Sequence, residues 1–379
     1  MSERPTPVGA LLRAAPPDRL PEVAAEHLRR HHCATRVEVL LGDLSLTALR
    51  PLIDPDGPLG NALAQRCFGS QRPVVDAASG THRAYLPLSA WGDRLGVLVV
   101  ETSLSTDNGA SEALGTVADE LAMALRAADV STDRYRRAQR RQRLTMAAEL
   151  QWELLPGRSL GDHRFLLAGQ LDPAYAVFGD HYDWSLTGDR LTVTVLNGHG
   201  DGLEAAVLTT VAVNAMRNAR RSGANIVEQA ELASDAVYAR FGGAGHAATL
   251  LLEIDLVDGQ VEAVDAGSPR AMIARDREIQ TVTLEQQLPL GMFGETRYET
   301  QKFSLEPADR LLVVSDGVHA AAPAGRSPYG ESALLTALRR TRLQPATEAV
   351  GTVMRNLREY HGGVEPEDDA VTVCLDWRR

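Results

Sequence analysis

Aspartates recur at the ends of apolar segments in the second half of this chain. Asp180 and Asp183 stand in FGDHYDW, Asp316 follows the apolar run LLVVS, and the pair Asp368 and Asp369 precedes AVTVCLDW. Side chains at strand ends are held by rigid backbone and can be aimed at one shared point. Mg²⁺ and Mn²⁺ prefer several oxygen ligands of this kind, with water completing the shell. The joint pattern indicates a divalent-cation site, although any one of these aspartates is also typical of an ordinary turn.

A glycine-rich turn lies between the first and second of these groups. The segment NGHGDGLEAA, residues 197–206, follows an apolar run and opens a predicted helix. Its glycines at 198, 200 and 202 allow the backbone to approach an ion or a phosphate closely, and a helix N-terminus favours anionic ligands. The turn matches neither GxxxxGK[ST] nor a strict GxGxxG loop, so by itself it does not specify a ligand.

The region that must position these residues, 161–379, alternates between strand and helix patterns. Strands are predicted at 191–196, 249–255, 260–265, 302–305, 310–315 and 370–376, and helices at 203–221, 226–241, 331–341 and 347–360. The helices come in pairs with strand runs between them, unlike a strict βαβ alternation. We therefore predict an α+β fold for this domain, an αββα sandwich of two antiparallel sheets flanked by helices.

The first part of the chain has a different pattern. After a tail at 1–20, the region 21–127 predicts a helix at 22–31, strands at 36–41, 46–51, 83–88 and 94–101, and a helix at 111–127. Gly92-Asp93 lies between the last two strands and predicts a hairpin. This order, and the segment HRAYLPLSAWGDRLGVLVVE in particular, resembles a GAF sensory domain, an α/β module. The resemblance identifies no ligand, and a dimerisation or scaffold role is favoured.

Residues 128–160 are predicted to form a helical linker. No glycine or proline interrupts the segment before Pro156, so we expect one unbroken helix across 129–155. Six arginines between 134 and 143 could mark a nucleic-acid surface. Acidic residues follow them and an apolar stripe accompanies them, which favours a solvated helix instead. We predict that this helix is a candidate coiled coil, forms a homodimer with its copy and links sensor to effector.

Composition argues against several classes of protein. The 379 residues include 39 Lys+Arg and 50 Asp+Glu, and the formal charge of -11 disfavours nucleic acid and anionic membranes as partners. Three distant cysteines form neither a disulfide framework nor a zinc motif. No apolar segment approaches the roughly 18 residues of a membrane span. We expect a soluble, cytoplasmic protein.

Six motifs of the second half recur in the order and spacing of a known family. They are FGDHYDW, NGHGDGLEAAVLTT, AGSPRAMI, LPLGM, LLVVSDGVHAA and DDAVTVCLDW. In these the chain resembles the PPM-type protein serine/threonine phosphatases, specifically the bacterial branch typified by stage II sporulation protein E. The resemblance implies a hydrolase that removes phosphate from phosphoserine or phosphothreonine at a binuclear Mn²⁺/Mg²⁺ site. It also implies a phosphorylated protein substrate, an anti-sigma-factor antagonist, which is the protein switch that frees an alternative sigma factor.

The resemblance assigns roles to individual aspartates. Asp180 matches the metal-site aspartate of the family's GDxxD motif, with Asp183 as a neighbour of less defined role. Asp316 matches the aspartate of the TDG motif. Asp368 matches the first of the paired terminal aspartates. These three residues and Asn197 are the predicted catalytic and metal-binding side chains.

The glycine turn departs from the family at one position. The family reads DxxGxG followed by two residues and AA, which places Asn197, Gly200 and Gly202 on the pattern. The backbone carbonyl of Gly198 is then a further expected ligand. Asn197 replaces the aspartate that bridges both ions, and removing a unit charge about 4 Å from an ion costs on the order of 4 kcal/mol at an effective dielectric near 20. Asp201, inside the turn, is an alternative source of that charge.

Two other positions differ from the family. Ser268 stands where the AGHPP motif has histidine, and Phe178 stands where the GGD motif has its first glycine. The histidines at 199, 246 and 319 are assigned no catalytic role.

Three interpretations stay open. The chain is an active metal-dependent phosphatase, a pseudophosphatase that binds a phosphoprotein without hydrolysing it, or a GAF ligand sensor with an uncharacterised effector. The retained Asp180, Asp316 and Asp368 favour the first over the third. Asn197 is the one feature that favours the second over the first, and the active enzyme is the leading hypothesis.

Overall fold

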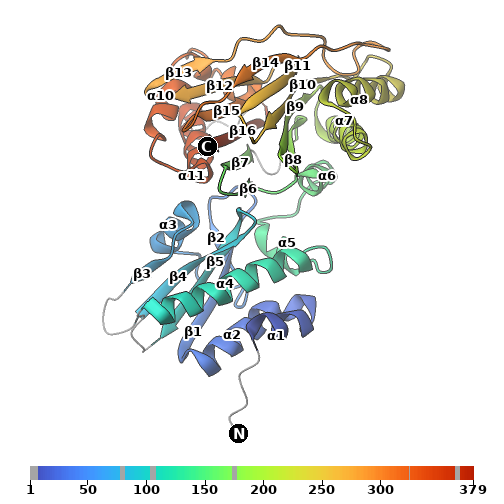
Figure 1. The fold of residues 1–379 in the computed structure, drawn as a ribbon. Coiled ribbons are helices and arrows are strands. Elements are labelled where there is room, and N and C mark those ends of the chain that lie inside the picture. Colours follow the sequence, from blue (N-terminus) through green and yellow to red (C-terminus); the bar gives the residue numbers. More distant parts are fainter. Residues whose placement is uncertain (1–6, 77–81, 103–107, 173–176, 324, 363–367) are drawn as a thin grey trace. The chain divides into compact units, whose positions relative to one another are not determined.

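The computed structural model describes residues 7–76, 82–102, 108–172, 177–323, 325–362 and 368–379. The chain divides into two compact units, Met1–Arg143 and Leu144–Arg379, each built from antiparallel sheet and helices (Figure 1). Within the described ranges, no helix combines the length and the apolar character that a membrane span requires.

The N-terminal unit is a five-stranded antiparallel sheet with the order β2-β1-β5-β4-β3. Its strands are β1 Ala34–Gly42, β2 Leu49–Pro51, β3 Val74–Asp76, β4 His82–Ala90 and β5 Asp93–Thr102. Its helices are α1 Val8–Ala14, η1 Pro17–Arg19, α2 Leu20–His31, α3 Ala62–Ser70, α4 Asn108–Ala128 and α5 Arg134–Gln139. One apolar core joins the sheet to α1, α2 and α4, and a second joins it to α3. Helices therefore cover both faces of this sheet.

The predicted hairpin of the N-terminal unit is confirmed. Ala90 pairs with Asp93, so Trp91 and Gly92 make a two-residue turn between β4 and β5. Both turn residues have positive φ, 51° and 85°, as the tight turns that suit twisted strands require. The assignment to GAF domains remains a prediction, because an antiparallel sheet covered by helices occurs in unrelated folds.

The expected unbroken helix across 129–155 is wrong. The structure has α5 and, in the C-terminal unit, α6 Met146–Leu154, with extended backbone at Arg140 between them. Tyr135 of α5 is buried in the core of the N-terminal unit, and Arg141 pairs with the buried Asp43. Thr145 then starts α6 as its N-cap. Tertiary contacts override helix propensity here, while pairing through this segment stays a prediction.

The C-terminal unit contains two antiparallel sheets. The five-stranded sheet has the order β14-β11-β10-β9-β8, and the six-stranded sheet β13-β12-β15-β16-β7-β6. The strands of the first are β8 Asp180–Thr187, β9 Arg190–Gly198, β10 Ala247–Asp255, β11 Gln260–Ala266 and β14 Gln301–Ser304. Those of the second are β6 Ser159–Gly161, β7 Phe165–Asp172, β12 Arg270–Arg275, β13 Glu278–Thr281, β15 Arg310–Val314 and β16 Ala370–Trp377. The predicted α+β class with antiparallel sheets is confirmed.

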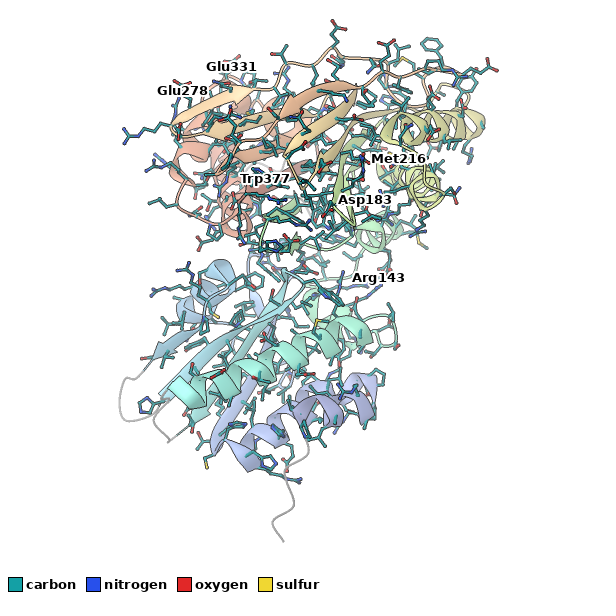
Figure 2. All side chains as sticks on the ribbon, viewed as in Figure 1. Arg143, Asp183, Met216, Glu278, Glu331 and Trp377 are labelled. Atoms are coloured by element: carbon teal, nitrogen blue, oxygen red, sulfur yellow. The ribbon has the colours of Figure 1, made fainter. Side chains whose placement is uncertain are left out.

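Helices pack on the sheets of this unit. They are α7 Gly202–Arg221, α8 Ile226–Phe241, α9 Asp316–His319, η3 Tyr329–Glu331, α10 Ala333–Arg340 and α11 Ala346–His361. The apolar side chains of both sheets share one core, which includes Trp377. A second core joins α7 and α8 to the five-stranded sheet and includes Met216, and a third joins α10 and α11 to the six-stranded sheet (Figure 2).

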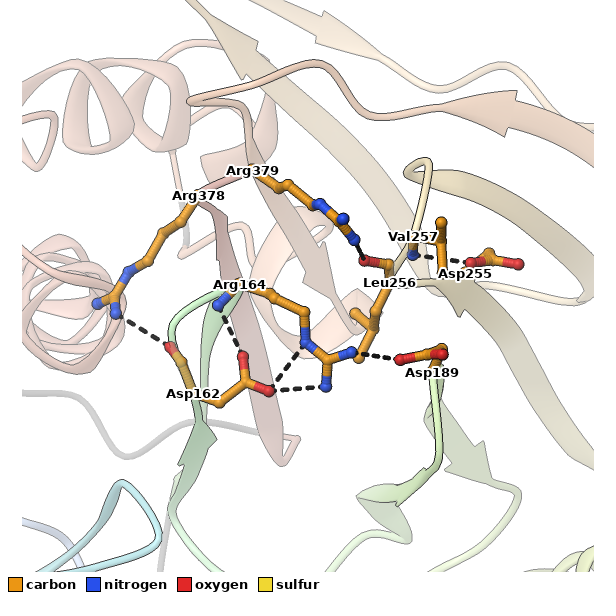
Figure 3. Close-up of polar contacts among 8 residues, drawn as sticks. All are labelled: Asp162, Arg164, Asp189, Asp255, Leu256, Val257, Arg378 and Arg379. Carbon is orange, nitrogen blue, oxygen red and sulfur yellow. Dashed lines mark hydrogen bonds and ion pairs between the residues drawn. The ribbon is translucent and has the colours of Figure 1, made fainter.

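Arginines tie the two sheets together at one end (Figure 3). Arg164, next to the start of β7, pairs with Asp162 at 2.7 Å and with Asp189 of the β8–β9 turn at 2.6 Å. Arg379 donates to the carbonyl of Leu256, 2.9 Å away, after β10. Because Asp180 and Asn197 pair at the other end of the β8–β9 hairpin, the candidate site lies at the opposite ends of these strands.

The shared core predicts a specific loss of stability. Leu252→Ala removes a side chain that is 1% exposed between the sheets, and we expect the free energy of unfolding to fall by about 3 kcal/mol. Leu343→Ala changes a side chain that is 89% exposed and should leave it nearly unchanged. Urea denaturation followed by circular dichroism measures both, and equal stability of the two variants would contradict this packing.

Candidate metal centre

Four aspartates meet at one end of the two sheets. Asp180 begins β8, Asp316 begins α9 directly after β15, and Asp368 and Asp369 precede β16. The charges of the last three each raise the pKa of Asp180. The structure therefore brings together the three aspartates predicted as metal ligands and adds Asp369, which the sequence analysis left without a role.

Asp180 carries the largest electrostatic cost. Its side chain is fully buried, and burial raises its pKa well above the ordinary value, with the neighbouring carboxylates adding to the shift. The Ser315 side chain favours the ionised form, although its hydroxyl does not reach hydrogen-bond geometry with Asp180. Neither carboxylate oxygen has a hydrogen-bond partner among the described residues. Two buried acceptor oxygens without donors are the chemistry that a bound cation would satisfy.

The pKa values of the terminal pair, Asp368 and Asp369, are also raised. Burial and the charge of Asp316 raise the pKa of Asp368 to about 6. Burial raises the pKa of Asp369 to about 7, although hydrogen bonds from the Phe178 amide and from Gln151 lower it.

The glycine after Asp316 is sterically required. A β-carbon on Gly317 would lie only 1.6 Å from the carbonyl oxygen of Asp369.

Asn197 lies within the cluster. It pairs with Asp180 across β8 and β9. Its side-chain nitrogen donates to Oδ1 of Asp316 at 2.5 Å, and the Gly317 amide donates to the same oxygen at 3.1 Å. The amide thus partly neutralises one carboxylate, but it adds no negative charge of its own.

The glycines before Asp180 and after Asn197 permit a close backbone approach. The Gly198 amide donates to the Gly179 carbonyl at 3.0 Å. A β-carbon on Gly179 would lie 2.1 Å from the Gly198 carbonyl oxygen, and Gly179 has a φ of 103°. In the turn itself, Gly200 and Gly202 have positive φ, 105° and 58°. These backbone conformations favour glycine, because residues with a β-carbon rarely adopt positive φ. The conformation of the turn therefore accounts for the glycine spacing that the sequence shares with ligand-binding loops.

An open hollow of about 580 Å³ lies over the turn. Its walls are Phe178, Asn197, Gly198, His199, Gly200, Asp201 and Asp368. The His199 ring stacks on His246 with 4.7 Å between ring centroids. Asp201 stands at the N-cap of α7 without a side-chain capping bond, so it remains an alternative source of negative charge.

The donor set fits a hard divalent cation. Asp180, Asp316 and Asp368 offer carboxylate oxygens, Asn197 offers a neutral amide, and Gly198 lines the same hollow. In the described part of the chain, however, no three or more histidine, cysteine, aspartate or glutamate side chains stand grouped as a ready metal site. Carboxylates that share a site repel one another when no cation lies between them.

Asp183 does not join the cluster. Asp183, labelled in Figure 2, is buried and pairs with Arg217 at 2.7 Å and with Arg220 at 3.2 Å, both on α7. Successive side chains of a strand point to opposite faces of the sheet. Asp180 and Asp183 are three residues apart, an odd number, so their side chains lie on opposite faces of β8. Its role is to anchor α7 on the sheet.

Two further residues support the cluster: Gln151, which was not predicted, and Asp369, which was predicted only as part of the acidic pattern. Gln151 of α6 donates from its side chain to the Asp180 carbonyl at 2.9 Å and to Asp369 at 3.0 Å. Asp369 was visible as the second member of the acidic pair, whereas nothing in the segment ELQWELLP sets Gln151 apart from a surface glutamine.

Comparison with known proteins defines the class. The SiaA-PP2C domain of Pseudomonas aeruginosa is similar, with 20% identity, 61% of this chain and 94% of that chain covered, and a TM-score of 0.52. The C-terminal unit therefore has a PP2C-type phosphatase fold. Residues 187–378 match the model of the Stage II sporulation protein E (SpoIIE) family. The chain belongs to this family.

Two further solved structures match this chain with TM-scores below 0.5. The RsbU and RsbW domains of a Mycobacterium tuberculosis protein share 20% identity, with 57% of this chain and 62% of that chain covered and a TM-score of 0.49. The PP2C domain with a regulatory fragment of SpoIIE from Bacillus subtilis shares 17%, with 56% and 63% covered and a TM-score of 0.48. The chain thus covers less than two thirds of these two. No curated protein sequence matches.

The acidic cluster predicts a pH-dependent stability in the absence of metal. The folded-state pKa values of Asp368 and Asp369, about 6 and about 7, lie above the ordinary 3.8. Their contribution is therefore fully present below about pH 4 and is lost as pH rises through 6 to 7. In chelator, we expect a lower melting temperature at about pH 8 than at about pH 5.5, and Mn²⁺ at pH 8 should restore it.

Asp369→Asn is the variant that isolates this effect. It removes one of the repelling charges, so the difference between the two pH values should shrink. Two results would contradict the assignment of the acidic cluster. One is a melting temperature in chelator that is higher at pH 8 than at pH 5.5. The other is a difference in melting temperature between the two pH values that Asp369→Asn leaves unchanged.

Proposed function

We propose that the chain is a Mn²⁺- or Mg²⁺-dependent phosphatase of phosphoserine and phosphothreonine proteins. The observation that carries the proposal is the buried, unpartnered carboxylate of Asp180 among three further aspartates, in a member of the SpoIIE family. Such a cluster is unstable without a cation, and cation-bound water is the nucleophile that phosphate ester hydrolysis needs.

Each part of the site has a role in this proposal. Asp180, Asp316, Asp368, the Gly198 carbonyl and the Asn197 amide oxygen would hold the ions. When bound, two ions lower the pKa of a water molecule and offset the charge of the phosphoryl group. The glycine turn lines the hollow with Gly200 and Asp201, directly before the N-terminus of α7, and a helix N-terminus favours an anionic phosphoryl group.

We extend the proposal to the substrate and to regulation. The resemblance to the stage II sporulation protein E branch supports a phosphorylated anti-sigma-factor antagonist as substrate. The N-terminal unit would then act as a GAF-like sensor, and pairing through residues 128–160 would form a homodimer. The break between α5 and α6 means that such pairing would use short helices rather than one continuous coiled coil.

Metal dependence tests the proposal directly. Hydrolysis of a phosphopeptide should require Mn²⁺ or Mg²⁺ and stop in chelator. Asp316→Asn should lower the rate by at least about 100-fold, because even outer-sphere partners of metal ligands contribute 10- to 100-fold. Asp276→Asn, in an exposed turn between β12 and β13, is the matched control and should keep full activity. Activity that persists in chelator or in Asp316→Asn would refute the site.

A pseudophosphatase is the second candidate function. The observation that favours it is the hydrogen bond from Asn197 to Asp316, which engages a ligand carboxylate with a neutral donor. A binding module of this kind would keep the hollow and the glycine turn while holding metal too weakly for turnover.

Asn197→Asp separates the two candidates. The substitution restores a negative charge without changing side-chain size, and we expect Mn²⁺ affinity to rise at least about tenfold, a third of the charge effect estimated above. A weakened phosphatase would gain turnover at limiting Mn²⁺, whereas a pseudophosphatase would acquire activity. Asn214→Asp, exposed on α7, controls for added charge. Equal Mn²⁺ affinity of Asn197→Asp and the natural protein in calorimetry would remove Asn197 from the metal centre.

A further inference from the structure

Gln151 and Asp369 form a buried polar pair behind the metal centre. Gln151 is 3% exposed and Asp369 is fully buried. Gln151 lies on α6, the first helix of the C-terminal unit, whereas Asp369 lies next to the last strand. Neither side chain lines the hollow over the glycine turn.

The pair holds the backbone that leads into Asp180. Nε2 of Gln151 donates to the Asp180 carbonyl at 2.9 Å and to Oδ2 of Asp369 at 3.0 Å. The same Oδ2 accepts the Phe178 amide at 2.7 Å. Gln151 therefore fixes one end of residues 178–180, and through Asp369 it supports the other end.

The middle of this segment has no freedom to compensate. The Gly179 carbonyl accepts the Gly198 amide at 3.0 Å and the Thr209 hydroxyl at 2.8 Å. A change in the Gln151 contacts would therefore rotate the segment about Gly179 rather than shift it. Such a rotation would redirect the Asp180 side chain, which is the next residue.

The helix that carries Gln151 is itself anchored. The Thr145 hydroxyl accepts the Ala148 amide at its start. At its end, Arg217 of α7 donates to the Leu154 carbonyl at 2.6 Å, and Arg217 is held by Asp183. The donor of Gln151 thus has a defined position relative to the sheet.

We propose that Gln151 is a positioning residue of the metal centre, which sets the direction of the Asp180 carboxylate by holding the Asp180 carbonyl and Asp369. The inference rests on the proposed function, since it concerns the centre assigned there. A glutamine that served only stability would leave metal affinity unchanged when its donor is removed.

The chain offers a matched control in Gln229 of α8. Gln229 is 1% exposed, its Nε2 donates to the Ala224 carbonyl at 3.0 Å, and its Oε1 has no partner among the described residues, as is true of Gln151. Gln229 contacts no residue of the acidic cluster through that bond. Gln151→Met and Gln229→Met remove the same donor from equally buried helices at similar side-chain length.

The experiment uses the full chain and compares three quantities. These are Mn²⁺ affinity by calorimetry, hydrogen exchange of the Phe178 amide in chelator, and melting temperature. We expect Gln151→Met to weaken Mn²⁺ binding about tenfold, as loss of partners behind metal ligands does, and to speed exchange at Phe178. Gln229→Met should lower the melting temperature as well, but it should keep natural Mn²⁺ affinity and Phe178 exchange.

Two results would overturn the inference. One is Mn²⁺ affinity and Phe178 exchange in Gln151→Met equal to those of the natural protein. The other is an equal loss of both in the control. If Gln151→Met does not fold, Gln151→Asn, which keeps a shorter donor, takes its place with the same expected direction. If the natural protein binds no Mn²⁺, the proposed function fails. Phe178 exchange then still tests the positioning role: faster exchange in the variant supports it, and unchanged exchange contradicts it.

Discussion

Repulsion among buried carboxylates is the constraint on which the C-terminal unit depends. Asp180 lies fully buried with Asp316, Asp368 and Asp369 as neighbours, and each of their charges raises its pKa. In a low-dielectric interior such a cluster opposes folding unless protons or cations neutralise it. The fold tolerates it because the rest of the unit is held by apolar cores on both faces of each sheet.

The sheets supply the precision that the cluster needs. Antiparallel pairing sets Asp180 opposite Asn197, and β15 and β16 deliver Asp316 and the terminal pair to the same end. Glycines remove the side chains that would prevent this approach, most clearly Gly317 against the Asp369 carbonyl. The arginine ties stand at the opposite strand ends (Figure 3), away from the acidic cluster.

Asn197 changes this balance in a defined way. A neutral amide in place of a carboxylate lessens repulsion, and its hydrogen bond to Asp316 stabilises the metal-free cluster. The same change lowers the attraction for a second cation. At this position, a neutral side chain therefore raises the stability of the metal-free protein and lowers its affinity for metal.

The sequence by itself determined the α+β class, most strands and helices of the C-terminal unit and the β4–β5 hairpin, because these depend on hydrophobic period and on local turn residues. The three aspartates Asp180, Asp316 and Asp368 were assigned from the resemblance of their motifs to the phosphatase family. It did not determine the break after α5, where Tyr135 and Arg141 gain partners distant in sequence. Nor did it determine the roles of Asp183, Asp369 and Gln151. Whether an aspartate meets an arginine or another carboxylate, and whether a glutamine reaches a carbonyl, is decided only when strands far apart in the chain are packed together.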